Sequence, residues 1–256
     1  MKVFIADTWW VCWRELKHLQ RQKIRIMLSL AQPIVWLALM GNLYQRIATI
    51  PGFPAPTYLD YMAPGIVIMV TLFGGVFGGM SVVWDRRLGF LQKMLASPVS
   101  RSSIVAGKML SIAVQNGLQA LLIFGLALAM GANFSAGPVG VFPLILLVTL
   151  LSMVFAGLSL ALGAVLTSHE AMIAVTNFFT MPLMFTSSAM MPLEMMPHWL
   201  SRLARWNPLT YAIDPMRELF LHGWNAISIV QGVVVLTLAA AVAAVLATNL
   251  FKGHFT

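Results

Sequence analysis

The chain has 256 residues, of which 59% are hydrophobic and only 9% charged, and its mean hydropathy is +0.85. A soluble domain carries roughly 25% charged residues, so this composition excludes a protein whose whole surface faces water and predicts an integral membrane protein. The net charge is +8. The basic residues gather at the ends of apolar runs, which favours anionic lipid headgroups over nucleic acid as their partners.

Residues 2–25 have the pattern of an amphipathic helix that lies at the inner membrane surface. At about 100° per residue, the apolar and the cationic side chains separate onto two faces. We expect the Trp rings at the interface and the cations toward anionic phosphates or a cytoplasmic partner; a plain membrane anchor is the alternative. The residues predicted to act here are Trp9, Trp13, Arg14, Lys17, Arg21 and Arg25.

Six apolar stretches are long enough to cross about 30 Å of hydrocarbon. None contains Asp, Glu, Lys or Arg, so each can lie in lipid without a buried charge. The first begins too late and is too long to be the core of a cleavable signal peptide. The predicted spans are residues 26–44, 61–83, 109–130, 139–166, 171–189 and 227–250, within a single domain of residues 1–256.

The basic residues also predict the orientation of the spans. With both termini inside, 12 of the 16 Lys and Arg residues lie on the inner side, which carries a net charge of +8. The outer segments hold the other four, balanced by four acidic residues, so their net charge is zero. Short inner loops are enriched in Lys and Arg. We therefore expect a multi-pass protein of the cell (inner) membrane with both termini in the cytoplasm.

The inner segment between the second and third spans, residues 85–101, is a candidate contact for a soluble subunit. A short helix is expected from Asp85 to Ala96, where Ser97 and Pro98 end it. Its mixture of apolar and basic side chains suits a groove on a partner, although a loop that only sets the orientation fits as well. The candidate residues are Asp85, Arg86, Arg87, Leu88, Leu91, Lys93, Leu95 and Arg101.

The outer segment, residues 190–225, is too charged to span the membrane and unusually rich in Trp. Such rings favour the outer membrane interface. Helices here either dip partway into the membrane, where protein satisfies their backbone groups, or form a surface cap. The candidate residues, to which the family resemblance given below assigns the role of an outer gate, are Pro197, Trp199, Trp206, Asn207, Pro208 and Tyr211.

Small and polar residues inside the spans predict helix packing. Gly74, Gly75, Gly78 and Gly79 let another helix approach closely, within the subunit or across a dimer. The polar side chains at membrane depth need hydrogen-bond partners, which a neighbouring helix or a substrate can supply. These polar residues are Gln115, Asn116, Gln119, Asn177 and Thr180.

The inner and outer segments resemble those of ABC-2 type transporter permeases, the group that contains drug-resistance and Nod-factor exporters. The inner match is DRRLGFLQKMLASPVSR at residues 85–101, followed by Gly107-Lys108. The outer match comprises Met191-Pro192-Leu193, Pro197-His198-Trp199-Leu200 and residues 206–211. The order of the elements agrees over nearly the whole chain, although Arg87 stands where many relatives carry an acidic residue.

This resemblance implies the membrane subunit of an ATP-binding cassette exporter of the daunorubicin-resistance and Nod-factor branch. It implies an all-α fold: an interface helix, six transmembrane helices, a cytoplasmic coupling helix, and an outer helical hairpin before the last span. Two copies would form a homodimer driven by two separate ATPase subunits, which would bind ATP and Mg. The expected cargo is an amphipathic drug, a lipid or a lipid-linked saccharide.

The sequence predicts no catalytic site and no bound cofactor in this chain. There is no G-x-x-x-x-G-K-[ST] phosphate loop, the five His residues are scattered, and the single Cys12 excludes an internal disulfide. His169 and Glu170, between the fourth and fifth spans, suit either a second contact with the ATPase or a simple turn. The alternatives are a lipid-modifying membrane enzyme and an ATP-independent carrier.

Overall fold

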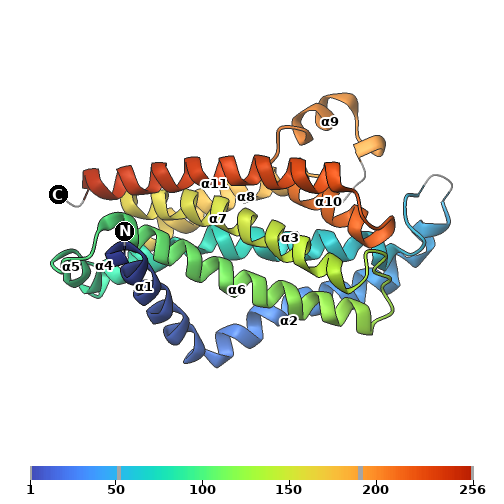
Figure 1. Cartoon of the computed structure of the whole chain (residues 1–256). Coiled ribbons are helices and arrows are strands. Elements are labelled where there is room, and N and C mark those ends of the chain that lie inside the picture. The colour runs from blue at the N-terminus through green and yellow to red at the C-terminus, as the bar shows by residue number, and fades with distance from the viewer. Residues whose placement is uncertain (1, 51–52, 190–192, 255–256) are drawn as a thin grey trace.

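The computed structural model describes residues 2–50, 53–189 and 193–254 of the chain. In these ranges every regular element is a helix, and most helices follow one long axis (Figure 1), which confirms the all-α fold class. The elements are α1 Lys2–Gln20, α2 Lys23–Leu43, η1 Gln45–Thr49, α3 Tyr58–Gly78, α4 Met80–Arg87, α5 Phe90–Leu95, α6 Arg101–Ala129, η2 Pro138–Gly140, α7 Val141–Val165, α8 His169–Phe185, η3 Leu193–Met195, α9 His198–Ala204, α10 Thr210–Leu221 and α11 Ala226–His254.

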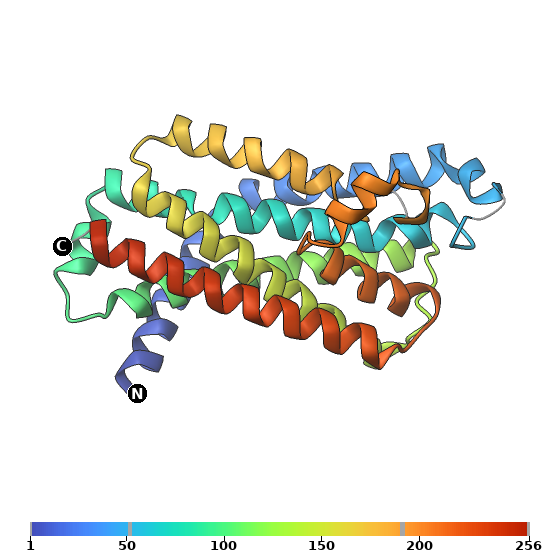
Figure 2. The ribbon, with the colours of Figure 1, turned by 90° about the horizontal axis from the view of Figure 1, so that it is seen from above.

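Helix α7 occupies the centre of the bundle, where it packs against α3, α6 and α11 (Figure 2). It is apolar all round, which is typical of a helix without a water-facing side. One apolar cluster joins α3, α6, α7 and α10, and a second joins α4, α5, α6, α7 and α11. The second cluster lies at the end of the bundle where α4, α5 and the end of α11 meet (Figure 1).

Four helical stretches are long and apolar enough to cross a membrane: Tyr58–Arg87, Arg101–Ala129, Pro138–Val165 and Ala226–Gly253. They make the chain a multi-pass membrane protein. The other two expected spans fall on α2 and α8. Helix α2 has 21 residues, or about 31 Å, and α8 has 17 residues, or about 25 Å, against about 30 Å of hydrocarbon.

The glycines of the second expected span lie at close helix contacts. A Cβ atom added to any of them would come closer than 3.0 Å to a neighbouring helix. The nearest residues are Asn116 for Gly74, Phe155 for Gly75, Ile112 for Gly78 and Ser159 for Gly79. At the break between α3 and α4, the N–H of Gly79 also donates to Ser159 Oγ at 2.9 Å.

The inner segment forms two helices instead of the single helix expected over residues 85–96. Helix α4 directly continues α3 and ends at Arg87. Gly89 then adopts a φ of +68°, which suits glycine because it has no Cβ. Helix α5 therefore starts at Phe90 in a new direction. The local pattern missed this break because apolar side chains continue on both sides of Gly89.

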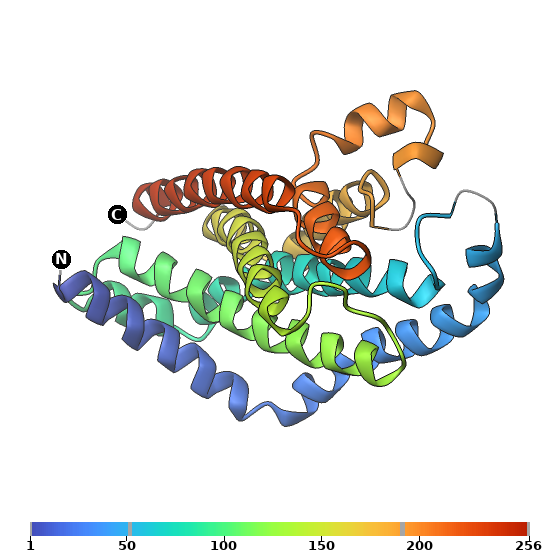
Figure 3. The same cartoon turned by 45° about the vertical axis from the view of Figure 1, so that its right-hand side comes forward.

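The N-terminal helix α1 ends at Gln20, before the expected end at residue 25. Arg21 lies in the turn that follows, and Arg25 belongs to α2, where its side chain lies outside the described part. Figure 3 shows α1 beside the first half of α6, against which it packs. Helix α1 is thus a docked part of the bundle.

The two ends of the bundle differ (Figure 1). Helices α1, α4 and α5 and the end of α11 lie at one end, and α9 and α10 lie at the other. Within the expected outer hairpin, α10 buries Ile213, Met216 and Phe220 in the bundle. Helix α9 instead stands away from the bundle (Figure 1), and residues 190–192 lie outside the described part of the chain.

Candidate functional site

A buried lysine lies where α1, α4 and α6 meet. Ser100 caps α6 by accepting a hydrogen bond from the N–H of Ser103 at 3.1 Å, so the helix starts early and Lys108 falls two turns inside it. The Lys108 side chain is only 1% exposed. Its Nζ donates to Glu15 at 2.8 Å, to Asp85 at 2.6 Å and to Ser81 Oγ at 3.2 Å.

Arg14 completes a closed ring of alternating charges with these groups. Its guanidinium lies 2.9 Å from Asp85 Oδ1 and 3.2 Å from Glu15 Oε1. Each carboxylate therefore bonds to both cations, and the four formal charges sum to zero. Burial of a charge is costly unless it is paired and hydrogen-bonded, and all four members of this charge ring (Arg14, Glu15, Asp85 and Lys108) meet that requirement.

The same arginine holds α5. The Arg14 guanidinium carbon lies 3.6 Å from the centre of the Phe90 ring, and Nη1 lies 3.4 Å from Met94 Sδ. A cation over an aromatic face contributes about 0.5–2 kcal/mol. Helix α1 thus reaches both helices of the inner segment through one side chain.

Gly107 allows α1 to come this close. A Cβ at position 107 would lie 2.7 Å from Val11 Cβ and 2.8 Å from the carbonyl oxygen of Thr8. Real Cβ atoms do not approach other atoms so closely, so any larger residue must push α1 off α6. The dipeptide Gly107-Lys108 therefore supplies the close contact and the buried charge in adjacent residues.

Two further basic residues of the inner segment bind helix C-termini. Arg86 donates to the carbonyl oxygens of Ala164 at 2.7 Å, Leu166 at 3.4 Å and Gly163 at 3.5 Å, at the end of α7. Arg101 donates to the carbonyl oxygen of Lys252 at 3.1 Å, near the end of α11. The last carbonyls of a helix lack partners within it and carry partial negative charge, which explains both contacts.

The residues expected to contact a soluble partner therefore divide into two groups. Asp85, Arg86 and Arg101 bond within the protein, while Leu91 is buried and Leu95 packs against the second apolar cluster. The side chains of Arg87, Leu88 and Lys93 are exposed. This exposed face of the inner segment (Arg87, Leu88 and Lys93) is the part open to a partner.

On α1, the buried side differs from the two faces expected. Val11 and Cys12 are buried, while Trp9 and Trp13 are exposed and stack 6.3 Å apart. Arg14 points into the bundle instead of toward phosphates, because Asp85 and Glu15 offer it buried charge partners; Lys17 and Arg21 are exposed. Burial raises the pKa of the Cys12 thiol, and the nearby Glu15 carboxylate raises it further.

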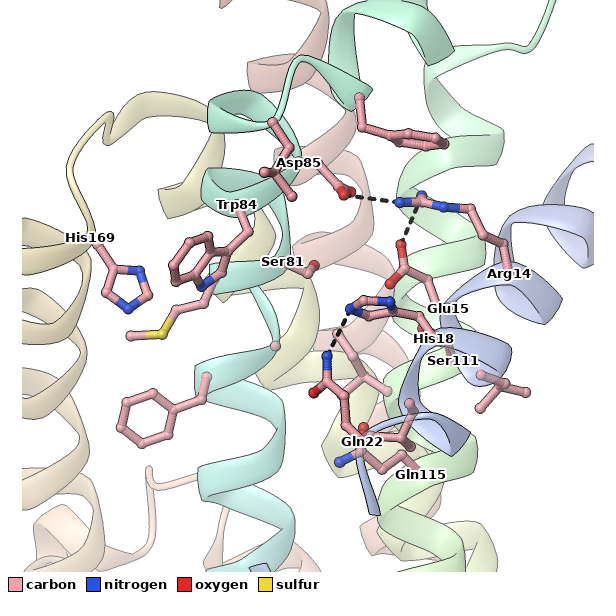
Figure 4. Close-up of a pocket in the computed structure, with 18 residues that line it drawn as sticks. Arg14, Glu15, His18, Gln22, Ser81, Trp84, Asp85, Ser111, Gln115 and His169 are labelled. Carbon is pink, nitrogen blue, oxygen red and sulfur yellow. Dashed lines mark hydrogen bonds and ion pairs between the residues drawn. The ribbon is translucent and has the colours of Figure 1, made fainter. Parts of the chain in front are cut away.

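A cavity of about 650 Å³ opens beside the charge ring (Figure 4). Arg14, Glu15 and Asp85 line one side of it. His18 and Gln22, whose Nε2 atoms are hydrogen-bonded at 2.8 Å, line another side. A second cavity of about 600 Å³ lies between α2, α3, α6 and α8 and is lined mainly by apolar side chains. Both cavities share four lining residues, Phe77, Gly78, Ile112 and Gln115.

The residues between the fourth and fifth expected spans lie on the far side of the first cavity. The His169 ring contacts Trp84 edge-on, with 5.1 Å between ring centres. Glu170 is exposed, and a hydrogen bond from its backbone N–H, with help from nearby Arg87, lowers the pKa of its carboxyl. Helix α8 is thereby attached to the end of α4.

Comparison with known proteins identifies the family. The family described as ABC-2 type transporter matches residues 6–221. The chain belongs to the ABC-2 type transporter family. It is 32% identical over 223 residues to a Cyanophora paradoxa protein named as transport permease ycf38, covering 86% of this chain and 76% of the relative.

Two relatives named for drug resistance extend this result. The daunorubicin resistance ABC transporter permease protein DrrB1 of Streptomyces coeruleorubidus is 25% identical, over 84% of this chain and 73% of its own length. The Mycobacterium tuberculosis protein named as doxorubicin resistance permease DrrC is 22% identical, over 99% of this chain and 90% of its own length. The family predicted from the two motifs is confirmed, so this chain is the permease, or membrane subunit, of an ABC transporter.

Polar contacts also join the helices at the end of the bundle that carries α9 and α10. Asn207 donates to the carbonyl oxygen of Leu183 at 2.7 Å and to Thr186 Oγ1 at 3.0 Å, which ties the α9–α10 turn to the end of α8. Arg217 of α10 donates to the carbonyl oxygen of Ser188 at 2.8 Å and lies over the Tyr61 ring at 3.9 Å.

The other candidate gate residues take no part in those contacts. Trp199 and Trp206 are exposed, and Pro197 directly precedes α9. Pro208 and Tyr211 are half-buried. The backbone of Tyr211 meets Gly232 of α11, where a Cβ would lie 2.5 Å from the Tyr211 carbonyl oxygen.

Most polar residues in the spans bond to other parts of the protein. Asn116 donates to Thr71 O at 3.1 Å and to Ser152 Oγ at 2.8 Å. Gln119 donates to Ser29 Oγ at 2.8 Å, and Thr180 donates to the carbonyl oxygen of Thr176 at 2.7 Å. Asn177 is exposed, and Gln115 lines both cavities.

Sequence reasoning missed the roles of Lys108 and Glu15. The sequence places Lys108 in a loop, one residue before the expected span, and gives Glu15 no role beyond its charge. The available signal was that Asp85 and Lys108 have opposite charges at the inner ends of two consecutive antiparallel spans, which lie at the same depth. Buried Asp60, which accepts from the N–H of Asn133 at 2.7 Å, was likewise placed outside its span.

Proposed function

We propose that two copies of this permease form an export path and that two separate ATPase subunits, which bind ATP and Mg, drive transport through it. Family membership implies an ABC ATPase as a partner. The observation that carries the proposal is the exposed face of the inner segment, Arg87, Leu88 and Lys93, on helices that are tied to α1 and α7 by partly buried polar contacts. A short amphipathic element of this kind suits a groove on a soluble subunit.

The proposed topology has six crossings, with both termini in the cytoplasm and the permease in the cell membrane. Helix α8 is short, but Ser187, Ser188 and Ala189 beyond it are buried in protein. Non-helical backbone is tolerated at membrane depth when protein surrounds it. Helix α2 has 21 residues, about 31 Å, which is long enough to cross the hydrocarbon.

The proposed cargo is amphipathic: a drug, a lipid or a lipid-linked saccharide. The two adjoining cavities support this class. The first offers polar groups from His18, Gln22 and Gln115, whereas the second is mainly apolar, with Phe73 and Met181 among its lining residues. A molecule with one polar and one apolar part matches this sequence of surroundings.

The test is transport by the permease reconstituted in proteoliposomes with its partner ABC ATPase. Daunorubicin and a fluorescent phosphatidylethanolamine serve as probes. We expect ATP-dependent movement of at least one probe, and none when the catalytic glutamate of the ATPase is replaced by glutamine. Movement that persists without ATP would favour a carrier instead, and chemical conversion of the lipid would favour a membrane enzyme.

A paired variant tests the proposed docking face. Leu88→Asp with Lys93→Glu places negative charge on the exposed face and should weaken association with the ATPase about tenfold or more. The matched control, Leu203→Asp with Arg205→Glu, changes exposed residues at the end of α9 and directly after it, at the opposite end of the bundle. Equal association of both variants with the ATPase in a pull-down would refute this docking face.

A further inference from the structure

The charge ring adds a polar link among three helices, α1, α4 and α6, which also make apolar packing contacts. The backbone of α1 packs closely against α6. Helix α4 buries Val82 and Val83, and α5 buries Leu91. Arg14 makes polar and cation–π contacts from α1 to α4 and α5, where it binds Asp85, Phe90 and Met94.

Lys108 closes this connection onto α6. Its ammonium holds Glu15 of α1 at 2.8 Å and Asp85 of α4 at 2.6 Å, so the two carboxylates are fixed relative to α6 as well as to each other through Arg14. Without a charge at Lys108, Glu15 and Asp85 would share one cation, and the inner segment would lose its direct polar link to α6.

We propose that Lys108 is a positioning residue for energy coupling, which makes α1, α4 and α6 move as one unit when the ATPase displaces the inner segment. This inference rests on the proposed function. Helix α6 runs from this site to the other end of the bundle, and its Asn116 bonds to α3 and α7 on the way. Displacement of α5 is thus delivered through the charge ring to a helix that spans the whole protein.

A buried ion network of this kind is weak as a source of stability. Replacement of a whole buried network by uncharged residues is often neutral or stabilising, whereas removal of one partner is strongly destabilising. This difference separates a positioning role from a structural one. A variant in which Lys108, Glu15 and Asp85 are all replaced by uncharged residues can fold and still lack the ionic link between the helices.

The experiment compares four variants in the reconstituted complex: Lys108→Met, Lys108→Arg, the triple variant Lys108→Met/Glu15→Gln/Asp85→Asn, and Lys252→Met. Lys252 has an exposed side chain on α11 and serves as the matched control. The readout is the number of probe molecules transported per ATP hydrolysed. We expect the triple variant and Lys108→Met to lose about 2- to 30-fold in this ratio, and Lys108→Arg to keep more of it than Lys108→Met.

A second readout, alkylation of Cys12 in the permease alone, does not depend on the proposed function. Cys12 is the single cysteine and is buried on α1. The triple variant should protect Cys12 as the wild type does, which shows that α1 is still docked. A wild-type transport ratio in the docked triple variant would overturn the inference, as would a higher ratio for Lys108→Met than for Lys108→Arg.

These outcomes are distinguishable from failure of the proposed function. If the wild-type complex transports no probe with ATP, the proposed function fails. If the wild type transports and the triple variant matches it, only the role of Lys108 fails. If undocking of α1 alone accounts for the loss, the triple variant will expose Cys12 in proportion to its lost transport, which also contradicts the inference.

Discussion

Gly107 and Val11 lie so close together that a side chain at position 107 has no room. A Cβ atom there would be 2.7 Å from Val11 Cβ. This contact is one residue away from Lys108, so the closest approach of α1 and α6 and the charge ring occupy the same place in the bundle. The size of residue 107 therefore sets whether the ring can close.

The first prediction is that Gly107→Leu releases α1 from α6. Overpacking typically costs about 1–3 kcal/mol, which corresponds to about a 5- to 150-fold larger undocked fraction. The rate of maleimide labelling at Cys12 should rise accordingly. Gly117→Leu is the control on the same helix, because nothing lies within 4 Å of a Cβ there. Equal labelling rates in the two variants would contradict the docking of α1.

The second prediction concerns Asn116, which joins three helices at the centre of the bundle. Asn116→Ala removes the donors to Thr71 and Ser152 and leaves their oxygens short of a partner. A buried group left without its hydrogen bond costs about 1–3 kcal/mol. The Tm in detergent should fall by several degrees, while Asn177→Ala, at an exposed site on α8, should leave it nearly unchanged.

Two adjacent arginines provide the third prediction. Arg86→Ala removes three contacts with the end of α7 and should lower the Tm. Arg87→Ala removes an exposed side chain, so the free energy of unfolding should stay within about 0.5 kcal/mol of the wild-type value and the Tm should hardly change. Binding of the ATPase should weaken. The Tm and a pull-down are measured for both variants. A reversed pattern would mean that the inner segment presents its other face to the partner.

The helical fold and the approximate positions of the apolar helices were predictable from the sequence, because uncharged runs of this length have few alternatives. The details of the inner segment were not. The break at Gly89 depends on a positive φ that a single glycine permits but does not require. Helix α8, with 17 residues, ends before its expected span does, because apolar composition does not show where a helix ends.

The charge ring was beyond sequence reasoning for a different reason. Arg14 and Glu15 are adjacent in α1 and fit the pattern of a water-facing side equally well. Their place in the bundle depends on partners far along the chain. Asp85 lies 71 residues after Arg14, and Lys108 lies 93 residues after Glu15. Only the packing of α1 against Gly107 brings the four charges together.

The fourth prediction uses the raised pKa of Cys12. Burial is the larger cause of the shift, and the Glu15 carboxylate adds to it. As the pH rises past the ordinary thiol value of 9.0, the unfolded chain loses its proton while the folded protein keeps it. The unfolded state then binds fewer protons, so the free energy of unfolding falls with increasing pH in this window. Below that value the thiol is protonated in both states and contributes no pH dependence.

The measurement compares the wild type with Cys12→Ala between about pH 8 and pH 10, around the ordinary pKa of a thiol. Other groups titrate in this range, but they are common to both proteins, so the difference in Tm isolates Cys12. The Tm of the wild type should fall more steeply than that of Cys12→Ala. Alkylation should also require a higher pH in the native protein than in the protein unfolded in SDS. Parallel Tm curves together with equal alkylation profiles would mean that Cys12 is open to water and that α1 is not docked as described.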